Sequence, residues 1–245
     1  MRLTNDQIQQ IERASLAEGL EIISNLFPGK VVFSSSLGQE DQVITDAVFK
    51  SNLPIKIFTL DTGRLFNESY ELLERTVARY KKPIQVYFPD AKDVEEFVTT
   101  KGANSFYESV DNRKECCHIR KVKPLNRALH GAGVWITGLR AEQSENRKGM
   151  KMIEWLEDKQ LYKYNPLLDW NYAEVLDYIK EFFVPYNTLH DRGFVSIGCA
   201  PCTRAIEPGE DPRAGRWWWE TSKKECGLHV HAEVPHINVN ANPVN

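Results

Sequence analysis

The strongest constraint on the fold is a repeated alternation of short apolar runs with polar turns and amphipathic segments. Apolar runs suited to buried strands lie at 31–33, 55–60, 84–88 and 134–139. Segments with helical spacing follow the first three, through Val48, over 67–80 and from Val94 onward. Strands that alternate with helices form parallel βαβ units with right-handed crossovers. We therefore expect an α/β fold with a parallel, twisted sheet flanked by helices.

The two ends of the chain differ from this alternating core. Helical spacing predicts one helix from Thr4 to Phe27, with Thr4 and Gln7 as a capping box, and another from Asn171 through Phe182. Beyond Val184 the chain is rich in Pro, Gly, Cys, Trp and His and shows little periodicity. We expect a single α/β domain over 1–225 and a loose C-terminal tail over 226–245.

The charge balance and the hydropathy exclude two classes of protein. Lys and Arg number 31 against 34 Asp and Glu, a formal net charge of −3, which lacks the basic excess of a protein that coats nucleic acid. No run approaches the roughly 18 apolar residues of a membrane helix, and the N-terminus does not resemble a signal peptide. We expect a cytoplasmic protein that binds neither membranes nor nucleic acid.

Four of the five cysteines form two close pairs, Cys116 with Cys117 and Cys199 with Cys202. In a reducing compartment, such thiols indicate metal ligands or nucleophiles. Four thiolates suffice for a tetrahedral zinc ion or for a four-iron cluster. The spacing favours the cluster, because adjacent thiolates can each bind a different iron. Zinc ligation and buried free thiols remain alternatives.

The fifth cysteine, Cys226, lies apart from these pairs. Lys223, Lys224 and His229 flank it and can stabilise a thiolate. An accessible thiolate beside cations is a candidate nucleophile, and an incidental surface thiol is the alternative.

Cationic residues near the predicted strand ends indicate an anion site. Ligands of open parallel sheets bind at the carboxyl ends of the strands, which here means the loops 34–41, 61–66 and 138–147. Arginine binds phosphate or sulfate through paired hydrogen bonds. The candidates are Arg120, Lys121, Lys123, Arg140, Arg147, Arg213 and Arg216. Three tryptophans at 217–219 could stack on a base, although a hydrophobic corner is the more frequent use of such residues.

Seven motifs occur along the chain in a fixed order: SSSLGQED at 34–41, LDTGR at 60–64, CCHIRKVKPL at 116–125, GLRAEQS at 138–144, CAPCTR at 199–204, RAGRWWW at 213–219 and ECGLH at 225–229. Together they resemble those of the assimilatory sulfonucleotide reductases, and among these the adenylyl-sulfate (APS) reductases. The resemblance implies an adenine-nucleotide α-hydrolase-like fold related to the ATP pyrophosphatases. The first loop departs from the SGGxDS pattern of the pyrophosphatases, as expected of a site that no longer cleaves ATP.

The resemblance also implies roles for individual residues. Cys116, Cys117, Cys199 and Cys202 would ligate a 4Fe–4S cluster, and Cys226 would be the catalytic nucleophile. Contacts to adenosine would come from Ser34, Ser35, Ser36 and Leu60. Contacts to the phosphosulfate would come from Lys121, Arg140, Arg213 and Arg216, with His229 close to the reacting thiol.

The implied activity is thioredoxin-dependent reduction of APS to sulfite and AMP through a cysteine S-sulfonate, in sulfate assimilation and cysteine biosynthesis. The reductant would be thioredoxin or a glutaredoxin-like protein. Three alternatives remain: the 3′-phosphorylated nucleotide PAPS as substrate, a zinc-stapled nucleotide-binding protein, and a nucleotidyl transferase acting on tRNA. The last would need an intact pyrophosphatase loop and a basic RNA-binding surface. The sequence leaves open whether the chain forms a homo-oligomer.

Overall fold

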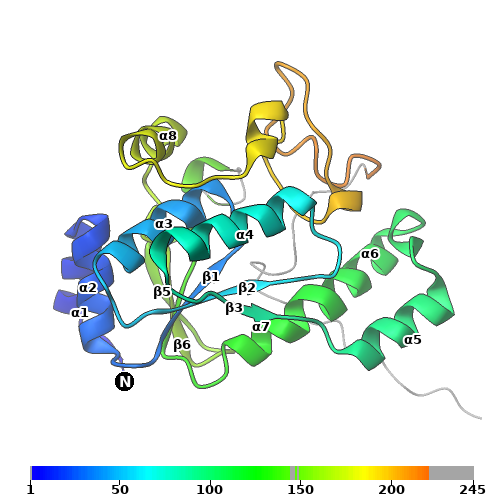
Figure 1. The fold of residues 1–245 in the computed structure, drawn as a ribbon. Coiled ribbons are helices and arrows are strands. Elements are labelled where there is room, and N and C mark those ends of the chain that lie inside the picture. The colour runs from blue at the N-terminus through cyan, green and yellow to red at the C-terminus, as the bar shows by residue number, and fades with distance from the viewer. Residues whose placement is uncertain (1, 144–146, 148, 221–245) are drawn as a thin grey trace, which may run out of the picture.

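A computed structural model describes residues 2–143, 147 and 149–220, which form a six-stranded sheet with helices on both faces (Figure 1). The strand order is β3-β2-β1-β4-β6-β5, and only β5 runs antiparallel to its neighbour. The strands are β1 (Val31–Ser35), β2 (Lys56–Leu60), β3 (Gln85–Tyr87), β4 (Val134–Ile136), β5 (Ile153–Leu156) and β6 (Leu161–Tyr164). The predicted α/β fold with a largely parallel sheet is confirmed.

Alternating side chains of the strands supply two hydrophobic cores. Val31 and Phe33 of β1 join the core under α1, α2, α3, α4 and α8, whereas Val32 joins the core under α7. The helices are α1 (Asn5–Arg13), α2 (Leu16–Leu26), α3 (Gln39–Lys50), α4 (Asn67–Tyr80), α5 (Ala91–Lys101), α6 (Val110–Cys117), α7 (Lys123–Ala128) and α8 (Tyr172–Glu181). In the described part of the chain, no helix is long and apolar enough to cross a membrane.

The N-terminal helix predicted over 4–27 is in fact two helices. Ala14 is extended, and Ser15 begins α2 by accepting a hydrogen bond from the Glu18 amide while the Glu18 carboxylate accepts one from the Ser15 amide. Because Ser15 and Glu18 form the N-terminal cap of α2, they cannot continue α1, and the first helix ends at Arg13.

The hairpin of β5 and β6 and the helical unit around the double cysteine were not predicted from the sequence. In β6, Lys163 is buried, and its Nζ lies 3.7 Å from Oε1 of Glu154 in β5. A charged residue therefore interrupts the apolar pattern by which a strand is predicted. The helix α6 continues through a π-helical turn, His118–Val122, into α7. The first cysteine pair therefore lies at the end of a helix rather than in a loop.

The order of the strands places a crevice beside β1. The chain proceeds from β1 to β2 and β3 on one side, and later to β4 and β6 on the other. The turns after β1 and β4 consequently diverge at neighbouring strand ends. Such a topological switch point is where open α/β sheets bind their ligands.

Candidate active site

A large pocket opens at this switch point, over the carboxyl ends of β1, β2 and β4; we call it the strand-end pocket. It has an empty volume of about 2060 Å³ including its open mouth, more than a nucleotide fills. Its wall contains every described residue to which the resemblance gives a substrate contact: Ser34, Ser35, Ser36, Leu60, Lys121, Arg140, Arg213 and Arg216. The chain thus brings these residues to one place, as the sequence analysis expected. Of the other candidates for an anion site, the wall contains Arg147 but not Arg120 or Lys123.

A buried carboxylate fixes the turn after β1. Asp41 accepts hydrogen bonds of 2.6 Å from both the amide and the hydroxyl of Ser36. Burial raises the pKa of Asp41 to about 6, although the Ser36 hydrogen bonds lower it in part. Gly138, after β4, leaves room for this carboxylate, because a Cβ there would lie 2.1 Å from Asp41 Oδ1.

Arg140 lines the pocket, but carboxylates already bind its guanidinium. Its Nε lies 3.0 Å from Glu40 Oε1 and its Nη1 lies 2.7 Å from Glu142 Oε2. Only 6% of the Arg140 side chain is exposed. Two carboxylates therefore offset the charge of the guanidinium that is predicted to contact an anion.

The end of the strand-end pocket beside Cys199 is cationic, because Lys121 and Arg216 lie close to that thiol, and Arg213 also lines the pocket. The guanidinium of Arg216 lies over the Trp217 ring at 4.8 Å, and its Nη1 donates to the Ile197 carbonyl at 3.3 Å. Its Nε is buried and has no hydrogen-bond partner in the structure. Gly198 makes space for it, because a Cβ there would lie 2.3 Å from Arg216 Nη2.

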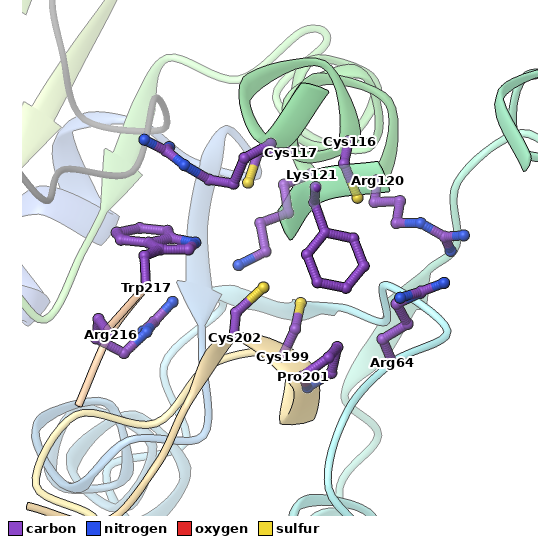
Figure 2. Close-up of a pocket in the computed structure, with 12 residues that line it drawn as sticks. Arg64, Cys116, Cys117, Arg120, Lys121, Cys199, Pro201, Cys202, Arg216 and Trp217 are labelled. Carbon is purple, nitrogen blue, oxygen red and sulfur yellow. The ribbon is translucent and has the colours of Figure 1, made fainter. Parts of the chain in front are cut away.

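A second pocket, the cysteine pocket, holds the four paired thiols (Figure 2). Cys116 and Cys117 come from the end of α6, whereas Cys199 caps a 3₁₀ turn over Ala200–Cys202 and Cys202 is its last residue. All four are free thiols. Figure 2 shows the two pairs facing one another, with the amine of Lys121 directed into the space between them.

The surroundings of Cys199 lower its pKa, whereas those of Cys202 and Cys116 raise theirs. Burial raises the pKa of Cys199, but the charge of Lys121 and a 3.2 Å contact with the Thr62 hydroxyl, with further cations, outweigh it and lower the pKa overall. Burial raises the pKa of Cys202 to about 12 and also raises that of Cys116.

Aromatic packing and a buried ion pair close the cysteine pocket. Trp217 packs with Phe106, Cys199 and Cys202, which confirms the hydrophobic-corner interpretation for this tryptophan. The guanidinium of Arg113 lies 4.6 Å from the Trp217 ring. It also makes a two-pronged pair with Glu220, at 2.8 and 2.9 Å, with both side chains buried. Cys226 and His229, two further predicted site residues, lie outside the described residues.

The two pockets share one wall, formed by Lys121, Cys199, Arg216 and Trp217. An anion bound at the cationic end of the strand-end pocket would therefore lie against the cysteine pocket. The sequence analysis did not name Gly198 or Asp41 as site residues. Two features of the sequence could have indicated them: Gly198 directly precedes Cys199, and Asp41 is the last residue of the motif at 34–41.

The comparisons with known proteins agree with this geometry. A family model described as "Phosphoadenosine phosphosulfate reductase domain" matches residues 30–205. A protein of Burkholderia cepacia named adenosine 5'-phosphosulfate reductase is 52% identical over 207 residues, covering 84% of this chain and 83% of the relative. A protein of the same name from Sinorhizobium fredii is 48% identical over 238 residues, covering 97% and 93%.

The structural likeness extends beyond these relatives. The crystal structure of phosphoadenylyl-sulfate (PAPS) reductase from Candida auris has a TM-score of 0.71 and 28% identity, covering 84% of this chain and 99% of that one. The FMN adenylyltransferase of Candida glabrata, with a TM-score of 0.52 and 17% identity, shares the fold alone, over 89% of this chain and 76% of its own. These neighbours confirm the predicted nucleotide α-hydrolase-like fold. By its family match and its close relatives, this chain belongs to the phosphoadenosine phosphosulfate reductase family.

Proposed function

We propose that this chain reduces APS to sulfite and AMP in assimilatory sulfate reduction in the cytoplasm. The observation that carries the proposal is the shared wall, since Lys121 and Arg216 line both a pocket that can accommodate a nucleotide and the pocket of the four thiols. The names of the relatives at about half identity support APS as the substrate.

The donor set of the cysteine pocket fits a 4Fe–4S cluster. Its four candidate ligands, Cys116, Cys117, Cys199 and Cys202, are all sulfur, which suits iron–sulfur clusters. The adjacent pair, Cys116 and Cys117, favours a cluster over one zinc ion, because neighbouring thiolates can each bind a different iron. When bound, the cluster would add its charge to the wall that the two pockets share.

The first step of the proposed reaction is nucleophilic. The Cys226 thiolate attacks the sulfuryl sulfur of APS, the bond from that sulfur to the phosphate oxygen breaks, and AMP leaves with the electron pair. A cysteine S-sulfonate remains. Lys121, Arg213 and Arg216 stabilise the charge that develops on the leaving oxygen.

The second step returns the enzyme thiol. A thiolate of thioredoxin attacks Cys226 Sγ and sulfite leaves, so that a mixed disulfide joins the two proteins. The second thioredoxin cysteine resolves this disulfide, and the dithiol thereby supplies the two electrons of the reduction.

Incubation with APS in the absence of thioredoxin tests this scheme. We expect one equivalent of AMP and a mass increase of one sulfonate on the Cys226 peptide, and sulfite release once reduced thioredoxin is added. The matched control is Cys226→Ser, which should keep its iron and bind AMP yet form no adduct. Turnover by that variant, or an adduct on another cysteine, would refute the scheme.

PAPS is the second candidate substrate, and the 28% identical PAPS reductase of Candida auris favours it. Competition between the two nucleotides in steady state decides between them. We expect a higher kcat/KM for APS, and an equal or higher value for PAPS would overturn that choice.

A further inference from the structure

His190 is a partly buried residue of the strand-end pocket to which the proposed reaction gives no role. It lies on a 3₁₀ turn, Thr188–Arg192, that begins after Asn187. The Asn187 amide group donates to the Ser69 hydroxyl of α4 at 3.2 Å, and its oxygen accepts from the Leu189 amide at 3.0 Å. These bonds fix the turn against α4, so the position of the His190 ring is set by the scaffold.

Both ring nitrogens of His190 are buried, and neither has a hydrogen-bond partner in the structure. The Phe194 backbone lies close enough to raise the pKa of His190 slightly, but it does not meet hydrogen-bond geometry. Unsatisfied buried polar atoms destabilise a folded chain, so each one needs an explanation. A pocket-lining residue with two such atoms is explained if a bound molecule supplies the partner.

The charge around His190 indicates which part of a ligand it meets. Burial lowers its pKa, and the main charges that act on it are the carboxylates of Glu40 and Asp191. Glu40 also pairs with Arg140, which offsets the positive charge of that guanidinium. The anionic part of a ligand would go to the cationic end, beside Lys121 and Arg216. A neutral imidazole has one donor and one acceptor and suits the hydroxyl and ring-nitrogen groups of a nucleoside.

We propose that His190 is a substrate-binding residue whose ring hydrogen-bonds the nucleoside part of the nucleotide. The inference rests on the proposed function only in taking an adenine nucleotide as the ligand. It predicts that His190 contributes equally to the binding of AMP and of adenosine, because the two share the nucleoside and differ in the phosphate.

Calorimetric titration of the full chain, purified without oxygen, tests the inference with AMP and adenosine as probes. We expect His190→Phe to weaken both by the same factor, about tenfold. The ligand-free variant should melt no lower than the parent, because the substitution removes unsatisfied polar atoms. The matched control is Arg192→Gln on the same turn, whose exposed side chain pairs with Glu68 and should leave both affinities unchanged.

The outcomes separate this inference from the proposed function. Failure of the parent protein to bind either probe contradicts the proposed function. Equal affinities in the parent and in His190→Phe overturn the role of His190 alone, and a loss for AMP without one for adenosine overturns the nucleoside assignment. Should His190→Phe fail to fold, ¹⁵N spectra of the parent decide: unchanged His190 ring resonances on addition of AMP would reject the contact.

Discussion

The two pockets differ in what holds them together. The strand-end pocket is built on β1, β2 and β4, whose backbone ladders fix the turns that carry its polar residues. The cysteine pocket is built from a helix end, a 3₁₀ turn and the irregular chain before Glu220, held by Trp217 and the Arg113–Glu220 pair. The backbone of the first is fixed by the sheet, whereas the second depends on side-chain contacts and on whatever its thiols bind.

This difference predicts that damage to one pocket spares the other, except at the wall they share. The largest expected effect is that of Cys116→Ser. Cys116 lines the cysteine pocket but not the strand-end pocket, so its loss should abolish iron binding and APS reduction while AMP affinity stays close to that of the parent. Iron analysis measures iron binding, a sulfite assay measures APS reduction, and calorimetry measures the affinity for AMP. A variant that retains its full iron content and activity would remove Cys116 from the ligand set.

The converse damage is Gly138→Ala in the strand-end pocket. Its Cβ would lie 2.1 Å from Asp41 Oδ1 and 3.3 Å from the Asp41 backbone nitrogen, so the turn after β1 must move. We expect AMP affinity to fall about ten- to a hundredfold, the worth of one or two hydrogen bonds to a charged ligand, with iron content unchanged. Gly149→Ala is the control, because a Cβ there would meet nothing within 4 Å. Parent-like AMP binding by Gly138→Ala would show that this turn does not form the nucleotide site.

The fold was largely predictable because its strands are compact apolar runs that alternate with helices. The runs at 31–33, 55–60 and 134–139 became β1, β2 and β4, and the loops after these strands line the strand-end pocket. The hairpin of β5 and β6 was missed because Glu154 and Lys163 occupy strand positions, and they become compatible with the sheet only once the two strands pair.

The site residues could be predicted from the sequence where the type of residue by itself indicates its chemistry. Four cysteines and a few cations stand out in any sequence, and the structure brings the described ones together. The pairing of Arg140 with Glu40 was hidden, because it joins the segment after β4, which also carries Glu142, to the first turn of α3. A single histidine such as His190 carries no signal at all in the sequence, since its burial and missing partners exist only in the folded chain.

A smaller effect concerns the free energy of unfolding, and it tests whether the buried carboxylate of Asp41 in the strand-end pocket has a raised pKa. Burial raises the pKa of Asp41 to about 6, above its value in an unfolded chain. The protonated form therefore stabilises the fold, and this contribution is lost as the pH rises through about 6. From about pH 5 to about pH 7 the free energy of unfolding due to Asp41 should fall by about 1 kcal/mol.

Urea denaturation of the parent and of Asp41→Asn over this pH range isolates that contribution, because other groups titrate alike in both proteins. The parent should lose stability relative to the variant as the pH rises. The amide oxygen of the variant can still accept from Ser36, so the turn should persist. A difference between the two proteins that is independent of pH would contradict the raised pKa.

The smallest effect is expected at the wall that the pockets share, where Gly198→Ala should act only through Arg216. The new Cβ would lie 2.3 to 2.7 Å from three atoms of the Arg216 guanidinium, and the flexible end of that side chain can move whereas the backbone stays. Displacing it should lower kcat/KM for APS about fivefold, less than the ten- to hundredfold expected of Arg216→Ala, with iron content unchanged.

A double variant tests whether Gly198 acts only through Arg216. If Gly198 matters only because it leaves room for Arg216, adding Gly198→Ala to Arg216→Ala should change kcat/KM no further. Additive losses would instead mean that Gly198 shapes the cysteine pocket directly, through its neighbour Cys199, and that the two pockets are joined by the backbone as well as by a guanidinium.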